Sequence, residues 1–285
     1  RRESVEHRQN HIASSSCTLA MIASEMSVVP YSFAMHGPDI FFEPHHWRLD
    51  KKIETAAFVS CISYFCRSQA MLFSAPQHWE KLHIVHCGVE PERYSLGPRP
   101  ERPTLLFVGR LAAVKGVPVL FDALSLIIKD HPSVLLRLIG DGPERKRLEA
   151  RVIEMGLKDH VEFCGYRSQS EVAEALSETE IFVLPSFAEG VPVVLMEAMA
   201  SELPVVTSRI AGVPELVEDG VSGVLVPPGS VAHLADALNM LLNDSALRKA
   251  MGRAGCAKVK GEFDSFKEAE KLRRHFQHDG SVDNS

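Results

Sequence analysis

The stretch TLLFVG (residues 104–109) opens a series of short apolar runs that decides the fold. The runs are apolar throughout, which is typical of strands buried on both faces of a parallel sheet. Amphipathic segments such as VPVLFDALSLIIKDH lie between them and predict connecting helices. The series therefore predicts one complete, doubly wound α/β domain. The later runs are VLLRLIG (134–140), VEFCG (161–165), IFVLPS (181–186), PVVTS (204–208) and GVLVP (223–227).

The first third of the chain carries fewer strand signals. Three apolar runs, near residues 28–35, 57–63 and 82–86, predict about half of a second α/β domain. Proline, glycine and charge dominate EPERYSLGPRPERP (90–103), which is typical of a linker. The expected division is residues 1–95 as a partial first domain, 96–103 as linker, 104–262 as the complete domain and 263–285 as a terminal helix and tail.

Composition narrows the class of protein. Of 285 residues, 45% are apolar and 24% charged, which excludes a disordered or fibrous chain. Lysine and arginine total 31 against 37 for aspartate and glutamate, so the formal charge is −6 and no nucleic-acid partner is expected. No apolar stretch approaches the roughly 18 residues of a membrane-spanning helix. Six cysteines stand singly among apolar neighbours, which favours reduced thiols in a cytoplasmic protein.

The strongest chemical signal is FAEGVPVVLMEAMA (187–200), with carboxylates at Glu189 and Glu197. Glu189 follows a predicted strand and so lies at the carboxyl end of the sheet, where open α/β sheets bind ligands. The amides of residues 190–193 begin a helix and suit an anion or sugar hydroxyls. Glu197 lies further along that helix, within reach of a ribose diol. Taken alone, the spacing also fits an amphipathic helix with two solvated glutamates.

A second signal, GRLAAVKG (109–116), follows the first strand of the complete domain. Arg110 can clamp a diphosphate through two hydrogen bonds, and Lys115 adds a compact positive charge. A surface loop with two solvated cations remains the alternative for these residues alone. The loops IGDGP (139–143) and CGYR (164–167) are weaker signals of the same kind.

In the first half, AMHGPDI (34–40) places His36 and Asp39 on a loop after a strand. His36 can donate a hydrogen bond to a sugar hydroxyl or a phosphate, although a solvated histidine fits the same pattern. The pair His45-His46 and the group His83, His86 and Cys87 raise the question of a metal, but His83 and His86 flank a strand that looks buried. Adjacent histidines do not readily face one ion, so no metal site is expected.

Together, the blocks GRLAAVKG, EAMASELPVV and IAGVPELVEDGVSGVLVPPG and the Glu189/Glu197 spacing resemble the nucleotide-sugar glycosyltransferases of family 4. The resemblance covers nearly the whole chain. It implies the α/β class and the GT-B architecture: two Rossmann-like, doubly wound domains facing a cleft, the first one incomplete. The blocks PYSFAMHGPDIF and LHIVHCGVEPERY resemble the bacterial exopolysaccharide, colanic-acid-type and lipopolysaccharide branch. Family members extend further at the amino end, which implies an amino-terminally truncated chain.

The resemblance also implies a role for each matching residue. Arg110 and Lys115 would bind the donor diphosphate, and Glu189 would hold the transferred sugar. Glu197 would bind the ribose, and His36 would face the sugar from the acceptor-side first domain. The implied catalytic residues are His36, Arg110, Lys115 and Glu189, and the implied donor-binding residues are Gly109, Arg110, Lys115, Gly140, Gly165, Tyr166, Glu189, Gly190, Val191, Pro192, Val193 and Glu197, with Asp39 beside His36 on the sugar or acceptor side.

Two departures from the family pattern stand out. Glu202 occupies a helix end where the family usually has glycine and where a positive φ is favoured. Ala34 stands where threonine is common, which removes one hydroxyl contact. The first departure predicts a modest loss of stability rather than of function.

The implied function is a retaining, metal-independent glycosyltransferase without a cofactor. It would move a sugar from a nucleoside-diphosphate sugar to a glycan or lipid-linked acceptor, in the cytoplasm and with peripheral contact to the inner face of the membrane as a further expectation. Two alternatives stay open at this point: a catalytically inactive nucleotide-sugar-binding fragment or subunit, and a GT-B enzyme of another type, such as a phosphorylase or an epimerase.

Overall fold

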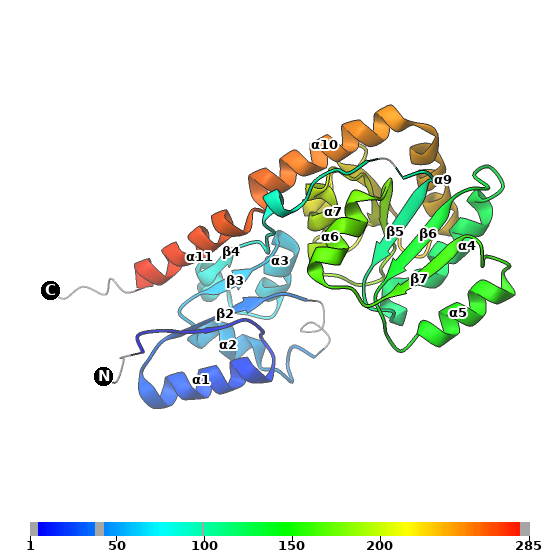
Figure 1. The fold of residues 1–285 in the computed structure, drawn as a ribbon. Helices are drawn as coiled ribbons and strands as arrows, with labels where there is room; N and C mark the ends of the chain where they lie inside the picture. Colours follow the sequence, from blue (N-terminus) through cyan, green and yellow to red (C-terminus); the bar gives the residue numbers. More distant parts are fainter. Residues whose placement is uncertain (1–4, 38–42, 99, 280–285) are drawn as a thin grey trace. The chain divides into compact units, whose positions relative to one another are not determined.

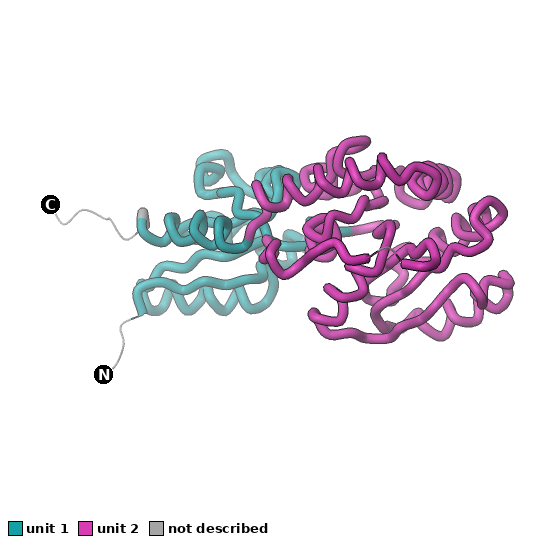
Figure 2. Tube along the Cα trace, turned by 45° about the horizontal axis from the view of Figure 1, so that its top comes forward, with its two compact units in different colours: residues 1–87, 189–191, 265–285 teal, residues 88–188, 192–264 magenta. Residues whose placement is uncertain are grey.

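The computed structural model describes residues 5–37, 43–98 and 100–279, which form two compact α/β units (Figures 1 and 2). Unit 1 takes its residues from 1–87, 189–191 and 265–285, and unit 2 from 88–188 and 192–264. The boundary therefore lies at residue 87 rather than 95, and the final helix belongs to unit 1. The observed boundary lies earlier in the chain than the expected one because Val89 already contacts unit 2. Val89 pairs with Asp264 and donates its N–H to the carbonyl of Phe263 (3.0 Å).

Unit 2 contains one parallel sheet in the order β10-β9-β8-β5-β6-β7. All six predicted strands are confirmed, and each lies within its apolar run. The side chains of β8 and β9 are all buried, as in a sheet covered on both faces, whereas the edge strand β7 has one buried residue, Val161. The strands are β5 (Thr104–Val108), β6 (Leu135–Ile139), β7 (Val161–Gly165), β8 (Ile181–Leu184), β9 (Val205–Ser208) and β10 (Gly223–Val226).

The strand order of unit 2 reverses beside its first strand. From β5 the chain builds β6 and β7 on one side, and then returns to place β8 on the other side of β5. The pairing joins Leu105 to Ile181 and Leu106 to Phe182. In open α/β sheets, the carboxyl end of such a switch point is where ligands bind. The loops after β5 and β8 both leave from this point.

The helices of unit 2 cover its sheet, and local chemistry explains several of their ends. Ser168 and Glu171 form a reciprocal capping box at the start of α6. Gly156, with φ of +69°, follows the C-cap residue Met155 of α5, and glycine adopts this left-handed conformation without steric cost. The helices are α4 (Val117–Ile127), α5 (Arg145–Glu154), α6 (Gln169–Ser177), α7 (Val193–Ala200), α8 (Val213–Leu216), α9 (Val231–Asn243) and α10 (Ser245–Glu262), with the short 3₁₀ turns η3 (Pro91–Arg93) and η4 (Ala113–Lys115).

Unit 1 contains a second parallel sheet in the order β1-β2-β3-β4. The sequence-based count of three strands is wrong, because β1 is a fourth. Its residues, Arg8–Asn10, are polar and carry no apolar signal, and the strand forms through backbone pairing with β2 at the edge of the sheet. The four strands are β1 (Arg8–Asn10), β2 (Tyr31–Met35), β3 (Val59–Cys61) and β4 (Leu82–Ile84).

A buried lysine organises the first helix of unit 1. The side chain of Ser14 makes no capping hydrogen bond at the start of α1. Instead, the fully buried Lys52 donates from Nζ to the carbonyls of Ala13 (2.8 Å) and Ser14 (2.9 Å). Burial lowers the pKa of Lys52. The helices of unit 1 are α1 (Ser15–Ser27), α2 (Leu49–Thr55), α3 (Tyr64–Leu72) and α11 (Ser265–Asp279), with the 3₁₀ turn η2 (Pro76–Lys81).

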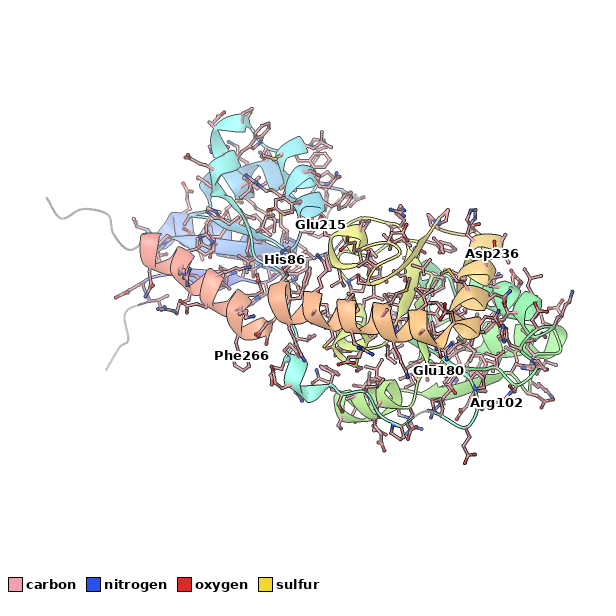
Figure 3. All side chains as sticks on the ribbon, turned by 90° about the horizontal axis from the view of Figure 1, so that it is seen from above. His86, Arg102, Glu180, Glu215, Asp236 and Phe266 are labelled. Atoms are coloured by element: carbon pink, nitrogen blue, oxygen red, sulfur yellow. The ribbon has the colours of Figure 1, made fainter. Side chains whose placement is uncertain are left out.

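The final helix, α11, is held to unit 1 by an aromatic cluster and a buried carboxylate. The rings of His83 and His275 stack with centroids 4.0 Å apart, and Phe276 meets Phe58 edge-on at 5.2 Å. Glu268 accepts a hydrogen bond from the backbone N–H of His86 (2.8 Å), a residue labelled in Figure 3. The predicted tail helix is therefore confirmed. These contacts explain why α11 belongs to unit 1, although it follows α10 of unit 2 in the sequence.

Candidate functional site

The loops after β5 and β8 interlock at the carboxyl edge of the unit 2 sheet. The N–H of Phe187 donates to the carbonyl of Val114 (2.7 Å). Gly116 has φ of +65°, and a Cβ there would lie 2.1 Å from the carbonyl oxygen of Pro185. Only glycine permits this close approach. The loop that carries Arg110 and Lys115 is thereby locked to the loop that leads into α7.

Three of the predicted glycines lie in a row at the same edge. The N–H of Gly140 donates to the carbonyl of Gly165 (2.8 Å), and Gly109 donates to Ile139 (2.9 Å). Gly140 has φ of +133°, and a Cβ there would lie 2.0 Å from the carbonyl oxygen of Gly109. Tyr166 follows this row and is 83% exposed. The carboxyl ends of β5, β6 and β7 therefore lie side by side. The row formed by Gly109, Gly140 and Gly165 is called the ledge below.

The two predicted cations flank the ledge. Arg110 is exposed, and within the described ranges its guanidinium makes no ion pair or side-chain hydrogen bond. Lys115 is half-buried in η4, and its Cε lies 3.8 Å from the position of a Cβ on Gly109. An anion near the Gly109 backbone would therefore lie close to the Lys115 side chain, and Arg110 is the next residue along the loop.

Glu197 is held by a tyrosine that the sequence did not single out. The Glu197 side chain, on α7, is buried, and its Oε1 accepts a hydrogen bond from the Tyr94 hydroxyl (2.8 Å). Burial, together with the hydrogen bond to Glu197, raises the pKa of Tyr94, so the hydroxyl stays protonated and acts as the donor. The interpretation of Glu197 as a solvated glutamate is wrong. Tyr94 lies in the stretch expected to be linker, and only the packing of η3 against α7 reveals its partner.

The start of α7 leaves backbone amides without a side-chain cap. Pro192 is the N-cap and Val193 the first helical residue, and in the part of the chain that the structure describes no side-chain cap hydrogen bond forms at Pro192. The preceding Glu189–Val191 segment is grouped with unit 1. A Cβ on Gly190 would lie 2.3 Å from the carbonyl oxygen of His36. Two predicted site residues from distant parts of the chain, Gly190 and His36, are therefore neighbours.

His36 follows β2 with an exposed side chain, and its Nδ1 lies 3.4 Å from the Sγ of Cys87. Asp39 lies outside the residues that the structure describes. Across residues 5–37, 43–98 and 100–279, no group of three or more histidine, cysteine, aspartate or glutamate side chains could hold a metal ion. All six cysteines are free thiols, as the sequence predicted.

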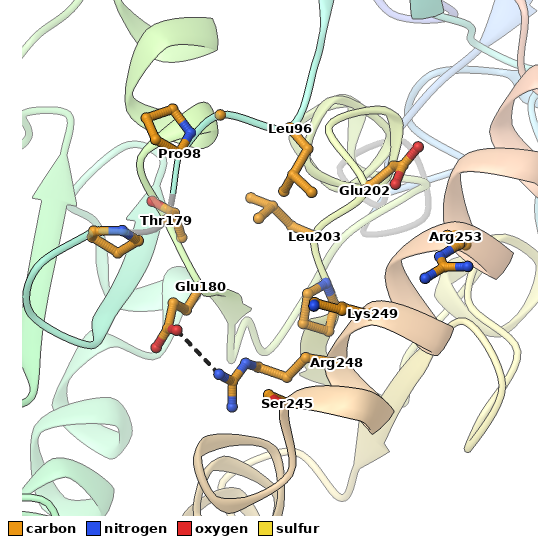
Figure 4. Close-up of a pocket in the computed structure, with 13 residues that line it drawn as sticks. Leu96, Pro98, Thr179, Glu180, Glu202, Leu203, Ser245, Arg248, Lys249 and Arg253 are labelled. Carbon is orange, nitrogen blue, oxygen red and sulfur yellow. Dashed lines mark hydrogen bonds and ion pairs between the residues drawn. The ribbon is translucent and has the colours of Figure 1, made fainter.

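The cavity drawn in Figure 4 lies at the other edge of the unit 2 sheet. Its volume is about 270 Å³, and its walls come from residues just before β8 and β9, at the amino ends of these strands, from the segment that precedes β5 and from α10. Arg248 crosses its floor to pair with Glu180 at 3.0 Å. The cavity is therefore separate from the ledge that carries the predicted site residues. None of the described helices is long and apolar enough to cross a membrane.

Comparisons with known proteins show the family to which this chain belongs. Residues 89–258 match the family model "Glycosyl transferases group 1". The amylovoran biosynthesis glycosyltransferase AmsK of Erwinia amylovora is 37% identical over 242 residues, 80% of this chain and 59% of that protein. The putative colanic acid biosynthesis glycosyltransferase WcaL of Escherichia coli is 36% identical over 56% of this chain and 41% of its own length. This chain thus spans about 41–59% of these relatives.

Solved structures show the same fold. Anabaena Alr3699/HepE in complex with UDP superposes with a TM-score of 0.86 at 22% identity, covering 95% of this chain and 79% of that one. Sucrose-phosphate synthase from Thermosynechococcus elongatus gives 0.85 at 23% identity, covering 98% and 74%. These likenesses, with the two parallel sheets, confirm the GT-B architecture. Because the family model covers more than half of the chain, this protein belongs to the group 1 glycosyl transferases.

Proposed function

We propose that the protein is a retaining, metal-independent glycosyltransferase that uses a nucleoside-diphosphate sugar, with unit 2 as its donor-binding part. One observation carries the proposal: the loop with Arg110 and Lys115 and the loop that leads to Glu189 and Glu197 leave neighbouring strands at the switch point and are joined by the Phe187–Val114 hydrogen bond. Open α/β sheets bind their ligands beside the carboxyl ends of the strands at such a switch point, which supports the proposal.

Each group at this edge has chemistry that suits one part of the donor. The Arg110 guanidinium offers paired donors to the diphosphate, and the Lys115 ammonium adds charge beside the Gly109 backbone. The uncapped amides at the start of α7 add a third source of positive potential. Glu197, oriented by Tyr94, can accept hydrogen bonds from a ribose diol. The exposed ring of Tyr166 can lie against a base.

The same cations explain how transfer would proceed without a metal. As the bond between the anomeric carbon and the diphosphate oxygen breaks, negative charge grows on the diphosphate, and Arg110 and Lys115 stabilise it. The acceptor hydroxyl oxygen bonds to the anomeric carbon on the same face, and its proton passes to a diphosphate oxygen. Positioning and leaving-group stabilisation then carry the catalysis, with no protein nucleophile.

The substrate class follows from the relatives. AmsK and WcaL bear names tied to amylovoran and colanic acid biosynthesis. We therefore propose a glycan or lipid-linked acceptor in bacterial exopolysaccharide or lipopolysaccharide synthesis, reached in the cytoplasm or at the inner face of the membrane.

Calorimetry with UDP, in buffer containing a chelator, tests the donor site. Arg110→Ala and Lys115→Ala should each weaken binding by about 1.5–3 kcal/mol, the size of a charge-assisted hydrogen bond. Arg147→Ala is the matched control, because this α5 arginine has a side chain 79% exposed and makes only a surface ion pair with Glu144. Unchanged affinity in both site variants, or binding abolished by the chelator, would contradict the proposal. Release of nucleoside diphosphate in the presence of acceptor then separates a transferase from a protein that only binds the donor.

A further inference from the structure

The ends of β2 and β4 bring a histidine and a cysteine together in unit 1. Both strands pair with β3, so all three carboxyl ends meet at one edge of the sheet. His36 follows β2 directly, and Cys87 follows β4 after two residues. The Cys87 Sγ lies 3.4 Å from the His36 Nδ1, within hydrogen-bond distance for sulfur. This contact joins a residue predicted to face the sugar to one with no assigned role.

The chemistry of the two groups decides which of them donates. Burial raises the pKa of Cys87 to about 11, so at neutral pH the group is a thiol with a proton to donate. An imidazole nitrogen is a good acceptor, whereas a thiol sulfur is a weak one. The favoured hydrogen bond therefore runs from the Cys87 S–H to the His36 Nδ1, and the imidazole proton then resides on Nε2.

We propose that Cys87 is a positioning residue that holds His36 as the Nε2–H tautomer. His36 then offers an N–H donor, rather than an acceptor, to a hydroxyl oxygen of the bound sugar. The inference rests on the proposed function for the identity of that ligand, but the tautomer is a property of the free protein. The Nδ1 of the neighbouring His86 does not compete for the thiol, because it lies 2.8 Å from the carbonyl oxygen of Ile62.

His86 also provides an internal reference. A carbonyl oxygen can only accept, so the ring of His86 must carry its proton on Nδ1. The two histidines are therefore expected to show opposite tautomers in one protein. A structural role for Cys87 alone would leave the position of the His36 proton unchanged.

Long-range ¹H–¹⁵N NMR correlation of the imidazole rings in the full chain, without ligand and at neutral pH, tests the proposal. The His36 signals are identified by their loss in His36→Asn. We expect the Nε2–H pattern for His36 and the Nδ1–H pattern for His86. Cys87→Ala should convert His36 to a mixture of tautomers, whereas Cys87→Ser, which keeps a donor, should retain the Nε2–H form. Cys164→Ala, which removes a half-buried thiol of unit 2, is the matched control and should change neither histidine.

Steady-state kinetics test whether Cys87 also affects sugar transfer. Cys87→Ala should lower kcat/KM by about five- to tenfold, the effect of losing one neutral hydrogen bond, and should leave UDP affinity unchanged. Cys87→Ser should recover most of that loss. An Nδ1–H pattern for His36 in the wild type, or an identical pattern in Cys87→Ala, overturns the proposal whether or not the protein transfers sugar. A shifted tautomer with unchanged kcat/KM overturns the positioning role while leaving the proposed function standing.

Discussion

At the scale of single residues, Glu202 has a conformation set by the local backbone, whereas Tyr94 makes a contact set by distant packing. Glu202 takes a left-handed conformation with φ of +57° directly after α7. The N–H of Leu203 donates to Ala198 (3.1 Å) and that of Glu202 to Met199 (3.0 Å), the pattern of a Schellman helix end. The positive φ expected from the sequence is confirmed.

Replacing Glu202 by glycine should raise the free energy of unfolding by about 1 kcal/mol, because glycine adopts this conformation without the steric cost of a Cβ. Denaturant unfolding measures the change. Glu202→Ala, which removes the carboxylate but keeps the Cβ, is the control and should give little of the gain. An equal gain from both substitutions would assign the effect to charge rather than to backbone strain.

Tyr94 is the other residue whose single contact has a measurable consequence. Tyr94→Phe leaves the buried Glu197 carboxylate without its hydroxyl donor, which should cost about 1–3 kcal/mol of stability. The same variant should weaken UDP binding, because the carboxylate loses its fixed orientation. Tyr166→Phe removes a hydroxyl from a side chain that is 83% exposed and should leave stability unchanged. Thermal unfolding compares the stability of the two variants. Equal stability would show that the Tyr94 hydrogen bond does not contribute to the free energy of unfolding.

At the scale of elements, α11 directly follows unit 2 in the sequence but packs in unit 1. Its aromatic and histidine side chains pack on the unit 1 sheet, with His83 and His275 stacked at 4.0 Å. Burial, followed by the charges of His275 and Arg67, lowers the pKa of His83 below its ordinary value of 6.5. The folded state therefore favours the neutral ring.

This shift makes the docking of α11 acid-sensitive. Below pH 6.5 the detached state binds more protons than the docked one, so docking weakens as the pH falls towards the folded pKa of His83. Hydrogen exchange of the α11 amides should accelerate over that interval beyond its intrinsic pH dependence. His83→Leu should abolish the extra acceleration, whereas His11→Asn, at an exposed position, should preserve it. Acid-independent protection of α11 in the wild type would contradict this interpretation.

At the scale of the whole molecule, the proposed function gives two carboxylates different roles. Glu189 belongs to the segment grouped with unit 1, and Glu197 lies on α7 of unit 2. Glu189 is proposed to contact the reacting sugar, and Glu197 the ribose, whose contacts are the same before and during reaction. Interactions of the first kind change kcat, and those of the second kind change KM.

Glu189→Gln should therefore mainly lower kcat, and Glu197→Gln should mainly raise KM, in a steady-state assay of nucleoside diphosphate release. Both variants keep the shape of the side chain and remove only its charge, so each serves as the control for the other. The opposite pattern would show that the roles of the two carboxylates are exchanged.

The sequence by itself determined the features that depend on neighbouring residues. The central strands of unit 2, such as β8 and β9, were predictable because a strand buried on both faces is apolar along its whole length. The strained end of α7 at Glu202 was predictable because helix-end geometry is local. The loops with Arg110 and Glu189 were expected at the carboxyl edge because each follows such a strand.

Only the tertiary structure decided the features that depend on contacts between distant residues. Strand β1 is polar and forms through backbone pairing, so no side-chain pattern marks it. Tyr94 is 103 positions from Glu197, and His36 is 51 from Cys87, and neither pairing leaves a trace in local sequence. The order of the strands placed β8 beside β5 and so brought the two loops together. Hydrophobic patterning indicates which side chains are buried. It does not indicate which residues contact one another, because such contacts depend on burial, charge and shape in the folded chain as a whole.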